Sequence, residues 1–301
     1  MSAVGHTRSL PSQVPGGIET QLRRLGAEIE LEPTAALYAP LQRFEPYAAS
    51  ISVERDERYG GDERHLLDVF AASGWGARAP VLVFVHGGGF TGGERRSGGS
   101  PFYDNIPLWA VNSGMVGVNM TYRLAPQHGW PAAQEDIGAA VGWLRQNIAE
   151  RGGDRGRIYL MGHSAGAAHV ALYLAHPQFH VAPGSGLAGA ILVSGLFDPA
   201  TAEADPSLEA YFGADRSVYP QRSALPGLLA SHVPLLLACA ELDPPQFGQQ
   251  CEQAHAALRD AGNCLPMLRL LGHSHMSEVY SINTPDRALT DALAAFVAST
   301  S

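Results

Sequence analysis

The stretch LMGHSAGAAHVAL, residues 160–172, places Ser164 where an apolar run ends and an alanine-rich run begins. The residues before it, RIYLM at 157–161, are mostly apolar, with a β-branched and an aromatic side chain, as in a buried strand. The residues after it, 165–174, are small and apolar at helical spacing. Ser164 is therefore predicted to lie on a sharp turn between a strand and a helix.

In that context the Gly-x-Ser-x-Gly pattern at 162–166 indicates an exposed serine nucleophile. Glycines at both flanks allow a turn too tight for side chains, and the serine is held in a strained backbone conformation. The backbone N–H groups and the dipole at the start of the helix favour negative charge near the hydroxyl. A serine that merely caps the helix is the structural alternative, and the preceding strand favours the nucleophile.

Short apolar runs alternate with amphipathic segments along the chain. Six runs suit strands of a parallel sheet that is buried on both faces: 81–85, 115–120, 157–161, 188–193, 234–239 and 267–271. Helices are predicted at 132–150, 246–260 and 286–298, and two antiparallel strands at 51–58 and 65–72. The fold class is α/β, with one domain over residues 1–301. Residues 1–48 and 197–232 do not fit the alternation, and we expect them to form a small cap.

Composition excludes several classes of function. The 301 residues are 46% hydrophobic and 16% charged, with a net charge of −9. This charge disfavours nucleic acid and anionic membranes as partners. The three cysteines suggest neither a disulfide framework nor a metal clip, and no signal segment or membrane span is apparent. We therefore expect a cytoplasmic protein with a small-molecule substrate, and a homodimer stays open.

A glycine-rich stretch, FVHGGGF at 84–90, follows the apolar run 81–85. Three consecutive glycines let the backbone turn its N–H groups into a shared cavity, where they can stabilise the oxyanion of an acyl-transfer intermediate. Gly88 and Gly89 are the expected donors, together with the N–H of Ala165. His86 is then a residue that shapes the loop.

These motifs resemble the hormone-sensitive-lipase-like branch of the α/β-hydrolase carboxylesterases. The resemblance rests on HGGGF, on TYRLAP at 121–126 and on GHSAG, in the family's order, and covers about residues 50–300. It implies a mostly parallel sheet of about eight strands, a helical cap, no cofactor and activity on short acyl esters. At two positions the sequence departs from the family's usual residues: His163 replaces an Asp, and Gly166-Ala167 replaces Gly-Gly. In this respect the sequence is similar to the related arylformamidases and feruloyl esterases.

A serine nucleophile needs a histidine base and a carboxylate that orients it, in the chain order Ser, acid, His for this fold. Asp243 follows the run 234–239 and matches the family's Asp-Pro position, with Asp198 and Glu241 as rivals. After the last strand, GHSHMSEV contains His273 and His275. His275 lies farther beyond the strand and is followed by Met276, as in the family's pattern, so His275 is preferred as the base.

The sequence thus predicts a cofactor-free serine carboxylesterase with Ser164, Asp243 and His275 as catalytic residues and no metal site. The expected substrates are short-chain esters, with aryl esters among the candidates. Amide hydrolysis of the arylformamidase kind and removal of acetyl or feruloyl groups stay open, and a non-catalytic binding protein is a remote alternative. Bulky residues near the pocket or its lid are expected to contact substrate: Phe90, Trp130, His169, Tyr211 and Phe212.

Overall fold

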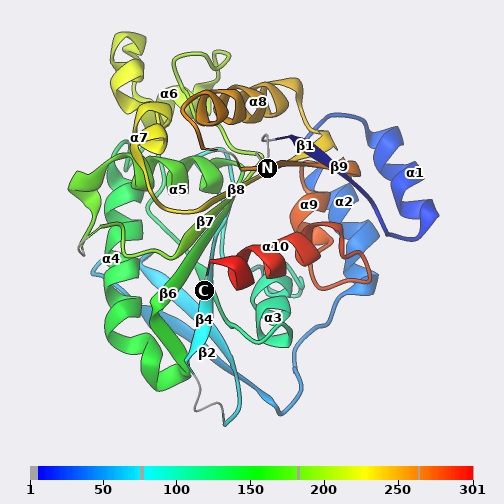
Figure 1. Cartoon of the computed structure of the whole chain (residues 1–301). Helices are drawn as coiled ribbons and strands as arrows, with labels where there is room; N and C mark the ends of the chain where they lie inside the picture. Colours follow the sequence, from blue (N-terminus) through cyan, green and yellow to red (C-terminus); the bar gives the residue numbers. More distant parts are fainter. Residues whose placement is uncertain (1–5, 75–77, 182–183, 264, 301) are drawn as a thin grey trace.

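A computed structural model describes residues 6–74, 78–181, 184–263 and 265–300. Its centre is one twisted sheet of nine strands, in the order β1-β9-β8-β7-β6-β4-β5-β3-β2 (Figure 1). The strands are β1 Thr7–Pro11, β2 Ile51–Arg58, β3 Leu66–Ala72, β4 Ala79–Val85, β5 Val116–Met120, β6 Gly153–His163, β7 Gly189–Val193, β8 Leu235–Leu242 and β9 Met267–Ser274.

The sheet is mostly parallel, as predicted. Only β3 runs antiparallel to its neighbours, β2 and β5, whereas the other paired strands are parallel. All eight strands predicted from the sequence are present. The ninth strand, β1, pairs with β9 at the edge of the sheet and belongs to the segment that the sequence assigned to a cap. This strand has five residues and is mostly exposed, so its sequence lacks the apolar pattern by which a strand is predicted.

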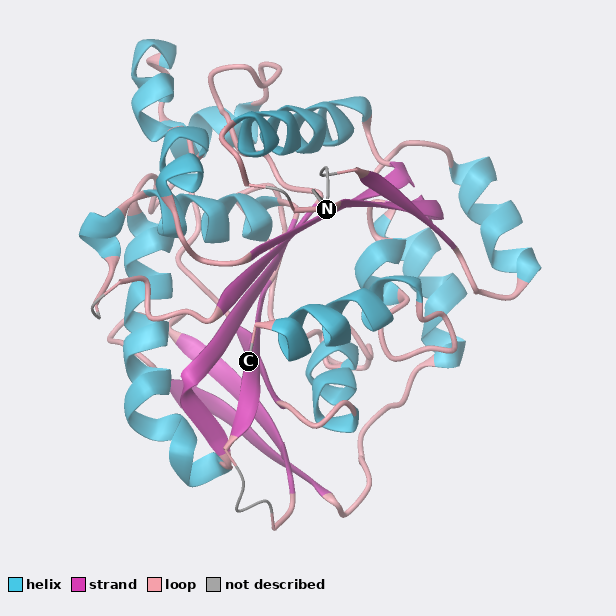
Figure 2. Ribbon diagram, in the orientation of Figure 1, coloured by secondary structure: helices cyan, strands magenta, loops and turns pink. Residues whose placement is uncertain are grey.

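Helices cover both faces of the sheet (Figure 2). Figure 1 shows α4 and α5 on one side and α3 and α10 on the other. The helices are α1 Gly16–Leu25, α2 Leu31–Tyr38, α3 Asn105–Asn112, α4 Ala132–Asn147, α5 Ala165–Ala175, α6 Pro206–Phe212, α7 Leu225–Ala230, α8 Pro245–Asp260, α9 Ser277–Tyr280 and α10 Ala288–Ser299; the 3-10 turns are η1 Ala39–Leu41, η2 Ile148–Arg151, η3 Pro177–Phe179 and η4 Arg216–Arg222.

Alternation along the central strands divides the apolar core into two layers. On β4, the side chains of Val81, Val83 and Val85 join the core under α4 and α5, whereas Leu82 and Phe84 join the core under α3 and α10. Successive side chains of a strand point to opposite faces, so a strand that is apolar throughout must be covered on both sides. This is why the short continuous apolar runs could be recognised as strands of a parallel sheet.

Among the described residues, no helix is long and apolar enough to cross a membrane. Cys239 and Cys251 are buried free thiols. Cys264 lies outside the described residues.

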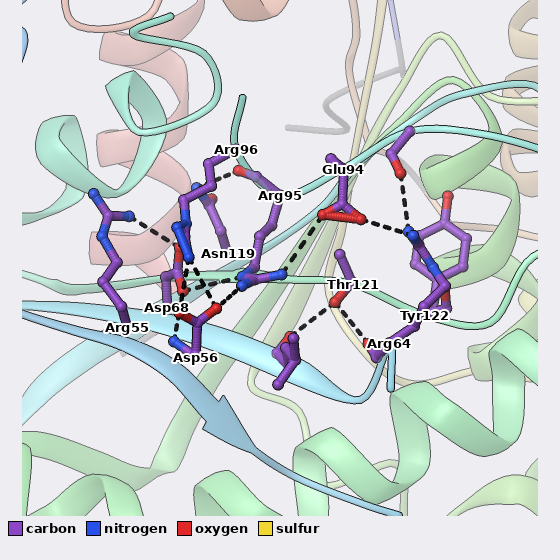
Figure 3. Close-up of polar contacts among 12 residues, drawn as sticks. Arg55, Asp56, Arg64, Asp68, Glu94, Arg95, Arg96, Asn119, Thr121 and Tyr122 are labelled. Atoms are coloured by element: carbon purple, nitrogen blue, oxygen red, sulfur yellow. Dashed lines mark hydrogen bonds and ion pairs between the residues drawn. The ribbon is translucent and has the colours of Figure 1, made fainter. Parts of the chain in front are cut away.

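The buried carboxylate of Asp68 connects strand β3 to the loop that follows the three glycines (Figure 3). Asp68 on β3 has no exposed surface and accepts hydrogen bonds from Arg55, Arg95 and Arg96 at 2.9, 3.0 and 3.0 Å. The side chain of Asn119 on β5 also donates to the backbone oxygen of Arg95, at 3.1 Å. Residues 95–96 are thereby fastened to β3 and β5, which limits how far the nearby glycine loop can move.

We expect Asp68→Asn to destabilise the fold by about 3 kcal/mol, because three guanidinium groups lose the buried carboxylate that they share. They keep their pairs with Asp104 and with the half-exposed Asp56. Urea denaturation measures the loss as a lower midpoint. Asp260→Asn is the matched control, since Asp260 forms an exposed pair with Arg259 and such pairs contribute little. Equal midpoints for wild type and Asp68→Asn would show that this cluster does not anchor the fold.

Candidate active site

Ser164 occupies the turn between β6, which ends at His163, and α5, which begins at Ala165. Its backbone has φ 57° and ψ −125°, a conformation that non-glycine residues rarely adopt. The Ser164 N–H donates to the Val193 carbonyl on β7 at 2.9 Å, which fixes the turn against the neighbouring strand. The residue is 8% exposed and lines a cavity.

Close backbone packing explains the glycine at the end of the pattern. A Cβ atom on Gly166 would lie 2.1 Å from the Val85 carbonyl oxygen of β4. Helix α5 can therefore begin directly on the central strands only because Gly166 has no side chain. Gly162 has a similar role, since its Cβ would lie 2.3 Å from the oxygen of Gly166.

The glycine loop after β4 turns toward the same cavity. Gly88 and Gly89 have φ angles of +132° and +58°, and both line the cavity with Ala165. The N–H groups of Gly88 and Gly89 donate to no acceptor in the part of the chain that the structure describes. Backbone N–H groups without a partner at a cavity wall are suited to bind an anionic oxygen.

His86 shapes this loop, as the sequence predicted. Its ring stacks on Tyr122 with centroids 4.5 Å apart, and the Tyr122 hydroxyl donates to the His86 backbone oxygen at 2.7 Å. Complete burial lowers the pKa of His86 to about 3, so the ring is neutral at neutral pH. A neutral ring packed in this way is structural.

A carboxylate and an imidazole meet at the cavity that Ser164 lines. The Nδ1 atom of His275 lies 2.7 Å from Oδ1 of Asp243, and both residues are buried. Oδ2 of Asp243 accepts hydrogen bonds from the Ser194 hydroxyl at 2.6 Å and from the Ala240 N–H at 2.9 Å. The other ring nitrogen of His275, Nε2, is buried without a hydrogen-bond partner among the described residues. His275 and Ser164 line the same cavity.

The rival residues lie in other surroundings. Asp198 accepts a hydrogen bond from the Ala200 N–H in a local turn, and Glu241 forms an ion pair with Arg23 at 2.9 Å. His273 lies within β9, not in the loop that the sequence suggested, and its Nε2 atom is 3.1 Å from Asp286. The structure thus pairs Asp243 with His275 and gives each of the three rivals other partners.

The cavity has a volume of about 820 Å³ and is lined by residues from both segments that the sequence singled out as caps. Glu28, Ile29 and Leu31 come from residues 1–48, and Glu203 and Leu208 from residues 197–232. Its charged side chains are all carboxyl groups: Glu28, Glu94, Glu203 and Asp205.

Of the five predicted substrate contacts, only Phe90 lines the cavity. Trp130, His169, Tyr211 and Phe212 are absent from the lining, which differs from the prediction. His169 and Tyr211 pack around the buried face of Phe90, with ring centroids 5.3 and 5.1 Å away, and Trp130 stacks on Phe212. These aromatic side chains support the glycine loop from behind. The sequence shows that these side chains are bulky, but whether they point into the cavity depends on tertiary packing.

Several residues of the site were not predicted. Ser194, which hydrogen-bonds Asp243, carries no motif of its own. His163 contacts the ring of His275 with centroids 4.6 Å apart, and its Nε2 atom lies 2.8 Å from the His275 backbone oxygen. Possible ligand atoms of His163, His275 and Glu278 lie within 4.8 Å of one another. One ring nitrogen of each histidine has a hydrogen-bond partner, Nε2 of His163 and Nδ1 of His275, whereas the other nitrogen of each has none among the described residues.

Comparisons with known proteins identify the fold family. A family model described as the alpha/beta hydrolase fold matches residues 82–278. Esterase LipQ of Mycobacterium tuberculosis is 30% identical over 272 residues, which cover 83% of this chain and 62% of LipQ. Carboxylesterase NlhH of the same bacterium is 33% identical over 201 residues, covering 62% of this chain and 59% of NlhH. The chain thus spans about three fifths of the length of these relatives.

Solved structures show the same architecture. Esterase B from Lactobacillus rhamnosis superposes with a TM-score of 0.72 at 20% identity, covering 95% of this chain and 94% of that chain. A hyperthermophilic esterase from the archaeon Pyrobaculum calidifontis gives a TM-score of 0.63 at 20% identity, covering 95% and 97%. At these identities the likeness establishes the fold.

We expect Gly166→Ala to lower both stability and activity, because its methyl group would overlap the Val85 carbonyl and push α5 away from β4. Overlap of this kind costs about 1–3 kcal/mol. Thermal unfolding and ester hydrolysis measure the two effects. Gly248→Ala in α8 is the matched control, since its Cβ would meet nothing within 4 Å and alanine favours a helix. Equal behaviour of the two variants would contradict the packing argument.

Proposed function

The chain belongs to the α/β-hydrolase family, and from this premise we propose that it is a serine carboxylesterase. The observation that carries the proposal is the 2.7 Å contact between His275 and Asp243 at a cavity that Ser164 shares. A histidine with one nitrogen bound to a carboxylate and the other free is arranged to accept a proton. The proposal is also supported by the names of the relatives LipQ and NlhH, an esterase and a carboxylesterase.

The mechanism follows from the positions of these groups. Nε2 of His275 takes the Ser164 proton as the hydroxyl oxygen attacks the ester carbonyl, and Asp243 stabilises the imidazolium that forms. The protonated histidine then donates to the leaving alcohol. Water, activated by the same nitrogen, attacks the acyl-enzyme and releases the carboxylic acid.

The glycine loop supplies the stabilisation of the tetrahedral intermediates. We propose that the N–H groups of Gly88, Gly89 and Ala165, which all border the cavity, donate hydrogen bonds to the negatively charged oxygen of the intermediate. These donors are set in place before the reaction, so that little reorganisation accompanies the appearance of charge. The start of α5 adds the positive end of its dipole.

The lining favours small, uncharged esters. A volume of about 820 Å³ accommodates a short acyl group and a modest alcohol, and the lining includes apolar side chains such as Phe102, Phe247 and Met276. Because its charged side chains are carboxyl groups, anionic substrates are disfavoured. We propose short-chain esters, aryl esters included, and keep amide hydrolysis as the alternative. The cap assignment, a cytoplasmic location and the oligomeric state stay predictions from the sequence.

The decisive experiment measures hydrolysis of a series of p-nitrophenyl esters from acetyl to palmitoyl, with an N-formyl anilide as the amide. We expect kcat/KM to peak between the acetyl and hexanoyl esters. Ser164→Ala should lower kcat at least about 10⁴-fold with the fold intact, because the nucleophile is removed. A phosphonate should label the wild type once, at Ser164. Near-normal turnover by the variant would overturn the mechanism, and best activity on palmitoyl esters would overturn the substrate class.

The choice of base is tested by replacing each histidine of the pair. His275→Ala should lower kcat about 10³-fold or more, because no other group can take the serine proton. His273→Ala should keep most of the activity per folded molecule but lower stability, since Asp286 loses the ring 3.1 Å away. Burial opposes the ionisation of Asp286, yet its hydrogen bond to His273 brings the pKa of Asp286 below its ordinary value. The reverse pattern of activity would assign the base to His273.

A further inference from the structure

His163 is a buried polar residue that the proposed mechanism does not use. It ends β6, directly before the proposed nucleophile Ser164, and is 1% exposed. Its two ring nitrogens have different surroundings. Nε2 faces a backbone oxygen, whereas Nδ1 has no hydrogen-bond partner among the described residues. Buried polar groups are nearly always satisfied, so the one hydrogen bond that this ring makes deserves a physical explanation.

The partner of Nε2 decides where the ring carries its proton. Nε2 lies 2.8 Å from the backbone oxygen of His275, the proposed base. A carbonyl oxygen can only accept a hydrogen bond, so Nε2 carries the proton and donates it. The nearest oxygen of Glu278 is 3.7 Å from Nε2, which is beyond hydrogen-bond distance. Burial lowers the pKa of His163 well below its ordinary value of 6.5, and the neighbouring His275 lowers it further, so Nδ1 carries no second proton.

The ring of His163 contacts two loops of the site. It packs against the ring of His275, with centroids 4.6 Å apart. Its Nδ1 atom faces the glycine loop, because a Cβ atom on Gly87 would lie 3.6 Å from Nδ1 and 3.0 Å from Cβ of Ser164. The ring is therefore confined between the glycine loop and the residue that supplies the proposed base, and it cannot turn freely away from the His275 backbone.

His275 needs such a support because it lies in a short connection. Residues 275 and 276 alone join β9, which ends at Ser274, to α9, which begins at Ser277. The His275 side chain is held by Asp243 at 2.7 Å and packs on Phe247, with ring centroids 4.4 Å apart. Its backbone oxygen receives no hydrogen bond from a backbone N–H in the part of the chain that the structure describes. The ring of His163 is the donor that holds this oxygen.

We propose that His163 is a positioning residue whose Nε2–H holds the backbone carbonyl of His275 and thereby sets the distance between the base and the nucleophile. His163 directly precedes Ser164 in the chain, so one hydrogen bond connects the turn that carries the nucleophile to the backbone of the base. Asp243 orients the imidazole, and His163 fixes the point from which that imidazole extends. This inference rests on the proposed function for its catalytic meaning, but the position of the His163 proton is testable without any substrate.

The first test locates the ring proton of His163 by ¹⁵N NMR of the histidine side chains. The signals of His163 are identified by their loss in His163→Gln. We expect a neutral ring with its proton on Nε2, unchanged from pH 6 to pH 9, because the carbonyl of His275 needs a donor. A proton on Nδ1 alone, or on both nitrogens, would overturn the proposal.

The second test compares the ester hydrolysis of His163→Met and His163→Gln. Both new side chains are unbranched and of similar length, but only the glutamine amide has an N–H to donate. We expect His163→Met to lower kcat about 10- to 100-fold with KM within about twofold of wild type, because a misplaced base slows the chemical step without weakening substrate binding. His163→Gln should keep kcat within about fivefold of wild type. His163→Asp should lose activity like the methionine variant, since an ionised carboxylate cannot donate to a carbonyl.

His255 on α8 offers the matched control. It is also buried, its Nε2 atom lies 3.1 Å from the Leu265 backbone oxygen, and it does not line the cavity. His255→Met and His163→Met should each lower the melting temperature by about 2–6 °C, because each leaves a carbonyl without its donor, but His255→Met should keep the kcat of the folded molecule. Equal kcat for the methionine and glutamine variants at position 163, or full activity of His163→Asp, would overturn the proposal. Absence of ester hydrolysis by wild type would refute the proposed function, and the NMR test would still decide the hydrogen bond.

Discussion

The contact between the start of α5 and the backbone of β4 constrains the whole site. Val85 ends β4 and passes directly into the glycine loop, while Gly166 is the second residue of α5, two positions after Ser164. Because the two segments meet backbone to backbone, the serine and the loop N–H groups are held at one edge of the sheet. The strained φ of 57° at Ser164 persists because neighbouring strands determine it on both sides.

The parallel order of the strands brings the remaining groups to that edge. Asp243 follows β8 and His275 follows β9, which are adjacent in the sheet, while β7 with Ser194 at its end lies between β8 and β6. Carboxyl ends of parallel strands lie along the same edge, where sites of open α/β sheets form. Residues more than 100 positions apart in the chain therefore meet without any long side chain having to bridge them.

The sequence was informative where a local rule governs the residue. Gly162 and Gly166 are required by the turn, so the elbow could be found from five letters, and apolar runs such as 81–85 identified strands buried on both faces. Which side chains face the cavity was harder to predict from the sequence. Whether Tyr211 faces the cavity or packs behind Phe90 depends on how α6 docks, and β1 is stabilised by pairing with β9, not by a pattern of its own.

Ser194 and Glu278 show that the buried polar residues around Asp243 were equally hard to predict from the sequence. A serine after a strand and a glutamate on a four-residue helix are unremarkable in sequence, and their meaning comes from complete burial next to Asp243. A buried carboxyl without a cation costs stability, because the unfolded chain can ionise it and the folded chain cannot.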